Sequence, residues 1–149
     1  MYRAQPGRPP SVGSAMTPFP YFVDLMDPVS TLEELMRAHT IRHVPVQSEG
    51  RVVGIVSERE LHHLVNPSLP RVDKARIRAR DVLIPNPYVA EIDTPLQTVV
   101  REMADRHIGS AIVVKHGKLA GILSVTDVCR TLAKLLEELH PSPGDDEVA

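Results

Sequence analysis

Two stretches of this chain share one pattern and lie 67 residues apart. Residues 54–60 read Gly-Ile-Val-Ser-Glu-Arg-Glu, and residues 121–127 read Gly-Ile-Leu-Ser-Val-Thr-Asp. An apolar run that ends in serine, with a carboxylate three residues later, is typical of a strand leading into a serine-capped helix. The same shift aligns residues 16–61 with residues 83–128 without a gap, so we expect two copies of one structural unit.

The local patterns predict the same order of elements in both copies. For the first copy we expect a strand over 21–25, a helix capped by Asp27 with Pro28 at its first position, a hairpin of strands over 44–46 and 51–56, and a helix from Ser57 to about Val65. For the second we expect a strand over 88–92, a helix opened by a capping box over 94–97, strands over 111–114 and 119–123, and a helix over 125–139.

These elements predict an α+β fold, in which two β-α-β-β-α units close on each other about a pseudo-twofold axis as one compact module. Composition sets the expected boundaries: a flexible, Pro-rich tail over 1–15, units over 16–66 and 81–139, a basic linker over 67–80 and an acidic tail over 140–149. The positive charges of the linker could form a solvent-exposed surface, or they could neutralise a phosphate bound between the units.

Composition excludes several classes of protein. The net charge is −2 and aromatic residues make up 3% of the chain, which argues against a nucleic-acid-binding surface. No apolar run is long enough to cross a membrane, and the N-terminus does not resemble a signal peptide, so we expect a cytoplasmic protein. The single cysteine, Cys129, cannot form an internal disulfide and is expected to be buried in the last helix.

Taken together, the Pro-capped helices at 27–28 and 94–95, the strand at 44–46 and the two Gly-Ile-x-Ser-x-x-acid signatures make each unit resemble a CBS motif. The pair resembles a free-standing Bateman module over about residues 16–137. The resemblance implies two units packed through their sheets, and two clefts that bind AMP, ADP, ATP or S-adenosylmethionine as a regulatory ligand rather than as a cofactor.

The resemblance also implies which residues bind the ligand. In the second unit Ser124 and Thr126 match the positions facing ribose or phosphate and Asp127 matches the ribose carboxylate, with adenine lined by Ile108, Ala111, Ile112, Val113, Pro87, Tyr88 and Val89. In the first unit the matching positions are Ser57, Arg59, Glu60, Ile41, Val44, Pro45, Val46, Pro20, Tyr21 and Phe22. Glu60 departs from the usual aspartate, whereas Arg59 stands where many family members carry a phosphate-binding cation, so we expect unequal sites.

Rival readings have weaker support. His39 and His43 are spaced for a metal on one helix, but Val44-Pro45 ends that helix and no third ligand is placed, so we expect no metal site. No hydrolase elbow surrounds Ser57 or Ser124, so we expect no enzyme.

The sequence therefore favours a sensor of adenosine-containing ligands that acts on an unidentified protein effector. The alternative is a ligand-independent dimerisation scaffold with vestigial pockets. A wide leucine stripe on the last helix also predicts a homodimer.

Overall fold

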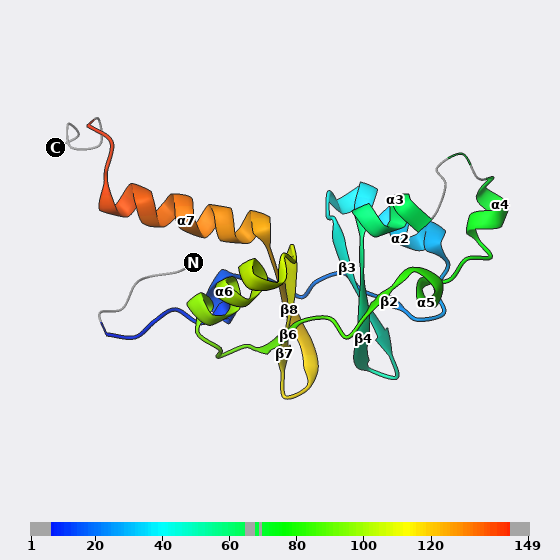
Figure 1. The fold of residues 1–149 in the computed structure, drawn as a ribbon, viewed down its shortest axis with the longest axis horizontal. Helices are drawn as coiled ribbons and strands as arrows, with labels where there is room; N and C mark the ends of the chain where they lie inside the picture. The colour runs from blue at the N-terminus through cyan, green and yellow to red at the C-terminus, as the bar shows by residue number, and fades with distance from the viewer. Residues whose placement is uncertain (1–6, 65–67, 69, 144–149) are drawn as a thin grey trace.

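Two four-stranded sheets form the centre of the molecule, and helices cover their outer faces (Figure 1). The computed structural model describes residues 7–64, 68 and 70–143. The expected helix end near Val65, the first six residues of the expected flexible tail and residues 144–149 of the expected acidic tail lie outside the described residues. The α+β architecture with two similar units is confirmed.

The first sheet has the strand order β2-β3-β4-β5. Its strands are β2 (Val23–Asp24), β3 (His43–Ser48), β4 (Arg51–Ser57) and β5 (Ile84–Pro85). Its helices are α2 (Val29–His39), α3 (Glu58–Leu64), α4 (Arg71–Lys74) and α5 (Ala79–Val82). Strands β2 and β3 are parallel, whereas β3, β4 and β5 pair antiparallel.

The second sheet repeats this arrangement with the order β6-β7-β8-β1. Its strands are β6 (Val89–Glu91), β7 (Ser110–Lys115), β8 (Lys118–Ser124) and β1 (Thr17–Pro18). Its helices are α6 (Leu96–Arg106), α7 (Val125–Leu139) and the short α1 (Val12–Ala15). The irregularity in register after Val46 recurs after Val113, so the internal repeat extends to details of strand pairing.

Each sheet is completed by the segment that precedes the other unit. Strand β1 pairs with β8 of the second unit, and β5 pairs with β4 of the first. The shared glycines of the two signatures lie where these strands pass, since a Cβ added at Gly54 would lie 2.9 Å from the carbonyl oxygen of Ile84. At Gly121 it would lie 2.8 Å from the carbonyl oxygen of Thr17. We call residues 12–18 and 79–85 the crossing segments.

Residues 12–15 of the N-terminal crossing segment lie within the stretch that composition predicts to be a flexible tail. Val12 is fully buried in the core of the second unit, and its N–H donates to the carbonyl of Thr94 at 2.8 Å. Ala79 makes the equivalent bond to Asp27 in the first unit, also at 2.8 Å. Residues 12–15 are therefore a packed part of the fold, because Val12 fills a place in the core that composition alone does not reveal.

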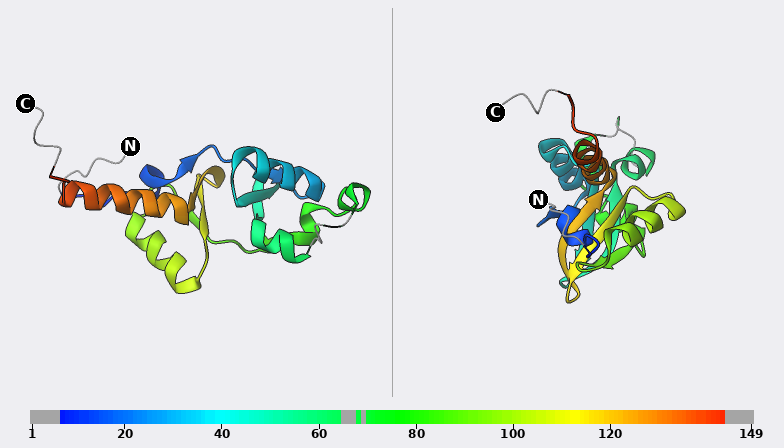
Figure 2. Two further views of the ribbon diagram at one scale, coloured as in Figure 1. Left: turned by 90° about the horizontal axis from the view of Figure 1, so that it is seen from above. Right: turned by 90° about the vertical axis from the view of Figure 1, so that its left-hand side faces the viewer.

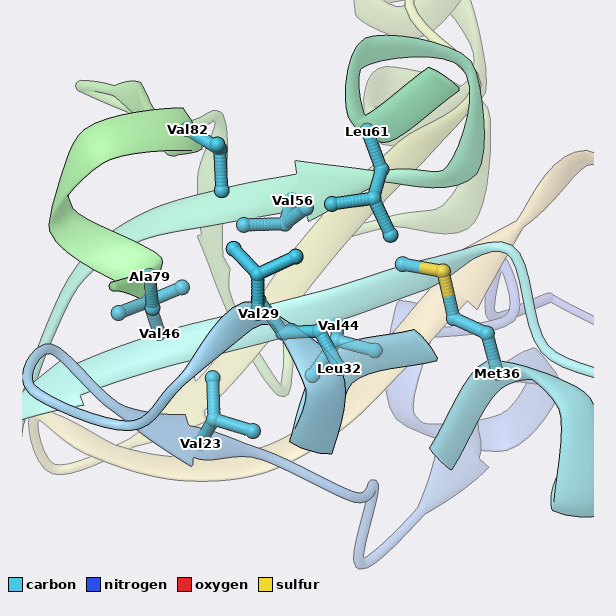
Figure 3. Close-up of a cluster of buried hydrophobic side chains, with 10 residues drawn as sticks. All are labelled: Val23, Val29, Leu32, Met36, Val44, Val46, Val56, Leu61, Ala79 and Val82. Atoms are coloured by element: carbon cyan, nitrogen blue, oxygen red, sulfur yellow. The ribbon is translucent and has the colours of Figure 1, made fainter. Parts of the chain in front are cut away.

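Apolar side chains from strands and helices form one core in each unit and a third cluster between the sheets. Figure 3 shows the first core, where Leu32 of α2, Leu61 of α3 and Val82 of α5 meet the valines of the strands. Between the sheets, Ile55 of the first unit packs with Ile112 and Val114 of the second. The units therefore pack through their sheets, as the resemblance implies.

The first turns of α2 and α6 are capped differently from the prediction. Neither Asp27 nor Thr94 is the N-cap; Pro28 and Pro95 hold these positions, without a side-chain cap. The first helical N–H groups donate instead to backbone carbonyls, Val29 to Ile77 at 2.8 Å and Leu96 to Pro10 at 2.7 Å. These acceptors lie just before the crossing segments, so tertiary structure satisfies groups that a side chain was expected to satisfy.

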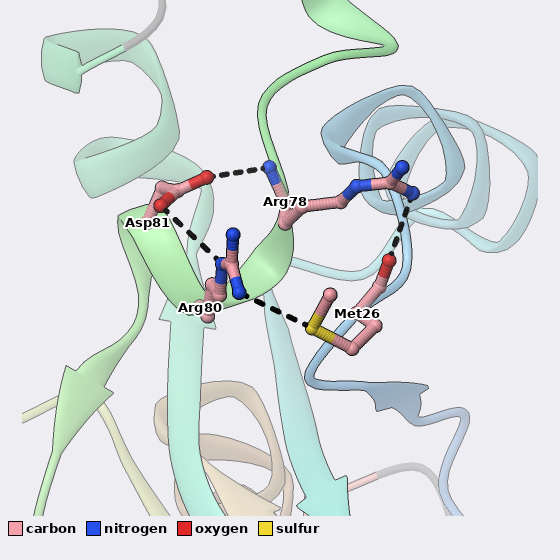
Figure 4. A network of polar contacts seen from close by, with 4 residues as sticks. All are labelled: Met26, Arg78, Arg80 and Asp81. Atoms are coloured by element: carbon pink, nitrogen blue, oxygen red, sulfur yellow. Dashed lines mark hydrogen bonds and ion pairs between the residues drawn. The ribbon is translucent and has the colours of Figure 1, made fainter.

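Arginines of the expected basic linker contact the first unit. Arg78 donates to the carbonyl of Met26 at 3.0 Å, and the Arg78 N–H donates to the Asp81 carboxylate at 2.8 Å (Figure 4). Arg80 contacts both Asp81 and the Met26 sulfur. Neither arginine lines the cleft described below, and their contacts hold α5 against the turn before α2.

Truncation of Val12 tests whether the N-terminal crossing segment stabilises the fold. We expect Val12→Ala to lower the free energy of unfolding by about 2 kcal/mol, because two methyl groups leave a fully buried site. Val89→Ala is the matched control, since Val89 is 41% exposed and its truncation should change little. Urea denaturation measures both, and a neutral Val12→Ala would mean that this segment contributes nothing to the core.

Candidate ligand-binding clefts

A cleft of about 600 Å³ lies where the two units meet. The first unit contributes the end of β4 and the start of α3, with Ser57 and Arg59. The second contributes the segment after β5 and the turn between α6 and β7. The lining residues are His43, Ile55, Ser57, Arg59, Ile84, Asn86, Pro87, Tyr88, Arg106, His107, Ile108, Gly109 and Ser110. We call this the Ser57 cleft.

The Ser57 cleft contains predicted ligand-binding residues from both units. Ser57 and Arg59 come from the first signature, whereas Pro87, Tyr88 and Ile108 were grouped with the second. The crossing strand explains this, because the pairing of Ile84 and Pro85 with Ile55 and Gly54 holds the chain beside β4 immediately before residues 86–88. Each signature therefore faces the residues that lead into the opposite unit. We call these residues, 17–21 and 84–88, the entry segments.

A tyrosine and an arginine of the second unit form one wall of the Ser57 cleft. The guanidinium carbon of Arg106 lies 4.8 Å from the centre of the Tyr88 ring, within the range of a cation–π contact. Burial and the nearby Glu102 raise the pKa of Tyr88, and Arg106 partly opposes them, so the phenol stays neutral. Arg106 is not among the binding residues predicted from the sequence, although it lies 67 residues after His39, at the equivalent position of the repeat.

His43 lies at the junction of the two units. A Cβ added at Gly109 would come within 3.2 Å of its Nε2, so the imidazole packs against backbone of the second unit. Burial and the adjacent Arg42 lower the pKa of His43, and Glu58 opposes them. The imidazole is therefore neutral at pH 7 and can offer the cleft both a donor and an acceptor.

The repeat predicts an equivalent site around the second signature, which we call the Ser124 cleft. The 67-residue shift assigns to it Ser124 and Thr126 with the entry segment Thr17–Tyr21. Three contacts support this placement: β1 pairs with β8, the Phe19 N–H donates to Ala120 at 3.0 Å, and the Thr17 hydroxyl donates to Asp127 at 3.0 Å. Tyr21 stacks on His39 with ring centres 3.7 Å apart, at the positions equivalent to Tyr88 and Arg106.

Asp127 is buried and forms several hydrogen bonds in the ligand-free protein. One carboxylate oxygen accepts from the Ser124 N–H at 2.8 Å and from the Ser124 hydroxyl at 3.0 Å, and the other accepts from Thr17. The capping box predicted for this helix is therefore present. The Glu60 N–H donates to the Ser57 hydroxyl at 3.1 Å, as the Asp127 N–H does to the Ser124 hydroxyl at 3.3 Å. The first unit differs at the position of Thr17, where Ile84 has no hydroxyl to donate. Glu60 is not among the described residues that line the Ser57 cleft.

Several other predicted site residues pack in the interior. Their side chains belong to the cores of the two units or to the cluster between the sheets: Val44, Val46, Ala111, Ile112 and Val113. Pro45 is also buried, and Ile41 lines a separate cavity between α2 and α3. Phe22 and Val89 are exposed, and Pro20 is half-buried. The buried strand residues could face a ligand only with their backbone groups.

Three further expectations concern other sites. Within the described residues no group of three or more metal-ligating side chains is present. No described helix has the length and hydrophobicity needed to cross a membrane. Cys129, expected to be buried, is exposed. Asp127 is the only buried residue of α7, which the structure describes in full and which runs along one end of the molecule (Figures 1 and 2), so most of the surface of this helix, Cys129 included, is uncovered.

The chain belongs to the CBS domain family. The family model of the CBS domain matches residues 12–66 and residues 79–134. Both matches begin at the start of a crossing segment. The resemblance inferred from the repeat and its signatures is therefore confirmed.

The relatives agree with this assignment. A zinc metalloprotease of Methanocaldococcus jannaschii is 30% identical over 126 residues, which are 83% of this chain but 33% of the metalloprotease. This chain thus spans about a third of that relative. A protein described as an acetoin utilization protein, from Vibrio cholerae, has a crystal structure with a TM-score of 0.78 at 25% identity, over 91% of this chain and 98% of its own.

Two similar structures contain adenosine compounds. The CBSX2 protein in complex with AMP has a TM-score of 0.72 at 26% identity, over 85% of this chain and 98% of its own. A CBS domain pair solved with 5′-methylthioadenosine and S-adenosyl-L-methionine has a TM-score of 0.72 at 18% identity, over 86% of this chain and 99% of its own, and shows the fold alone.

Protonation of His43 should destabilise the protein. Its pKa is lowered in the folded state, so its contribution to stability is present above the unfolded value of about 6.5 and is lost as pH falls below that value. We expect the free energy of unfolding to fall less between pH 7.5 and pH 5.5 in His43→Gln than in the wild type. Urea denaturation across this range measures the difference, and equal pH dependence in both proteins would contradict it.

Proposed function

We propose that this protein is a non-catalytic regulatory module that binds an adenosine-containing ligand between its CBS units and transmits occupancy to a protein effector. The observation that carries the proposal is the Ser57 cleft, which joins a hydroxyl, two arginines and an aromatic wall from both units. Its volume of about 600 Å³ lies in the range of roughly 300–1,000 Å³ typical of small-molecule sites.

The lining of the Ser57 cleft suits the parts of a nucleotide. Arg59 and Arg106 can neutralise phosphate, and Ser57 can bind phosphate or ribose oxygens. Ile55, Ile108 and Pro87 supply apolar surface for a base, next to the neutral imidazole of His43. AMP in the CBSX2 structure supports adenine nucleotides as the first ligands to test. Because both units contribute, a ligand would change the free energy of their contact, which is how occupancy could reach an effector.

In the Ser124 cleft, the proposed ribose contact of Asp127 involves an exchange of partners. The carboxylate oxygen that accepts from Thr17 would accept from a ribose hydroxyl instead. Thr17 belongs to the N-terminal crossing segment, so this exchange would loosen one contact between that segment and α7. The two clefts would then differ in their response, because Ile84 has no hydroxyl to exchange at the equivalent position.

A second candidate function, that of a dimerisation scaffold, is favoured by the outer surface of α7. Exposed apolar side chains on this helix form a stripe made of Val125, Leu132, Leu135, Leu136 and Leu139. Leu139 is 66% exposed, and such a stripe marks an interface in many proteins. One protein could have both functions, and a test for ligand binding shows whether the sensor function is present.

The contribution of Arg59 tests the sensor function. We expect Arg59→Ala to lower the affinity for AMP by about tenfold, the effect of losing one charged hydrogen bond, and to leave adenosine binding nearly unchanged. Isothermal titration calorimetry measures both affinities. Arg51→Ala is the matched control, since Arg51 is exposed at the start of β4 and outside the cleft.

A ligand must be identified before the affinities of these variants are compared. A thermal-shift panel of AMP, ADP, ATP, S-adenosylmethionine and NAD identifies any ligand, because a hundredfold excess over Kd stabilises the folded state by about 2.7 kcal/mol. Failure of every compound to bind with a Kd below the millimolar range would exclude the sensor function and favour the scaffold.

We further propose that the protein is a homodimer in which α7 contributes to the interface. Sedimentation velocity should then give about twice the chain mass of 16.5 kDa. Leu136→Glu should shift the equilibrium toward monomer, because a carboxylate would be buried at the interface. Arg130→Gln, an equal charge change on another part of α7, should not. A wild-type mass of 16.5 kDa at all concentrations would contradict the proposal.

A further inference from the structure

Phe19 combines two unusual properties. Its side chain is 91% exposed, and its backbone is in the left-handed region with φ of 49°. Left-handed backbone is unfavourable for a bulky side chain, and asparagine tolerates it better. At the equivalent position of the other unit, Asn86 has φ of 52°. The same turn therefore exists in both units, and only the N-terminal one contains an aromatic residue that neither the backbone nor the core favours.

The repeat and three contacts place Phe19 beside the second signature, in the predicted Ser124 cleft. Asn86, its counterpart, lines the Ser57 cleft. Phe19 itself is fixed by its N–H, which donates to Ala120 of β8 at 3.0 Å. On either side of it, Thr17 bonds to Asp127 and Tyr21 stacks on His39. The turn is thus held between the second signature and the end of α2.

We propose that Phe19 stacks on the aromatic base of a nucleotide bound in the Ser124 cleft. This inference rests on the proposed function and adds a residue that determines how the base is held. An exposed phenyl ring next to a polar cleft gains most when a flat aromatic ligand covers it, and stacking does not depend on the identity of the base. The strained position of the ring is consistent with a role in binding, because such strain clusters at ligand sites.

The two clefts then recognise a base by different means. Phe19 would give the Ser124 cleft affinity for any purine through stacking, whereas Asn86 offers the Ser57 cleft amide hydrogen bonds that depend on the edge of the base. The Ser57 cleft also has Arg59, where the Ser124 cleft has Thr126. We therefore expect base stacking to dominate in the Ser124 cleft, and phosphate and base-edge contacts to dominate in the Ser57 cleft.

A tryptophan reporter tests the contact directly. The chain has no tryptophan, so Phe19→Trp introduces a single indole. Titration with AMP should quench its fluorescence if the base stacks on position 19. Asn86→Trp reports in the same way on the other cleft. AMP binding measured by calorimetry without any change in the Phe19→Trp fluorescence would overturn the inference.

Two further variants separate stacking from stability. Phe19→Asn should leave the unfolding midpoint of the ligand-free protein unchanged or raise it, because asparagine tolerates the left-handed backbone. It should lower AMP affinity about tenfold, within the range for loss of one stacked ring. Phe19→Leu keeps an apolar side chain but removes the ring and should weaken AMP binding similarly. Calorimetry in an Arg59→Ala background reduces the contribution of the Ser57 cleft.

The outcomes distinguish this inference from the proposed function. If AMP binds and both position-19 variants retain wild-type affinity, the stacking role is wrong while the sensor function stands, and the exposed ring would instead suit contact with a protein. If the wild type binds none of the adenosine compounds, both fail. Weaker AMP binding together with unimpaired ligand-free stability would support the inference, since a purely structural residue would not give this combination.

Discussion

The structure depends on the exchange of crossing segments between the two units. Strand β1 completes the second sheet and β5 completes the first, so neither sheet is complete without chain that precedes the other unit. The glycines of the two signatures permit this exchange, because a side chain at Gly54 or Gly121 would meet the carbonyl of the passing strand. The clefts follow from the same geometry, since each crossing strand leads the entry segment of one unit to the signature of the other.

The two clefts have the same backbone plan and different chemistry. Thr17 bonds to Asp127, whereas Ile84 has no hydroxyl to offer at the matching position. Tyr88 lies beneath the cation of Arg106, whereas Tyr21 stacks on His39. A duplicated unit can keep its fold while its surface residues diverge, because the core positions that fix the sheets are few and apolar. The two signatures therefore lie in chemically different surroundings.

The sequence was sufficient to predict the repeat, the order of elements, the α+β class and the bounds of α7 at Val125–Leu139. It did not predict the crossing of segments, because a two-residue strand such as β1 has no periodicity and a repeat does not indicate which sheet a strand joins. It also did not predict the helix caps. The first helical N–H groups donate to backbone carbonyls of distant residues and not to the side chains of Asp27 and Thr94, and such long-range contacts leave no local pattern in the sequence. The buried strand residues, such as Ala111 and Val113, could not be assigned from sequence to core or cleft, because both environments favour apolar side chains.

The central claim is that one ligand site is built from both units, and a crystal structure of the protein with AMP tests it most directly. The account predicts AMP in the Ser57 cleft, with phosphate near Arg59 of the first unit and the nucleotide in contact with the entry segment of the second unit at Pro87 and Tyr88. AMP in contact with residues of only one unit, or bound away from both signatures, would contradict the account.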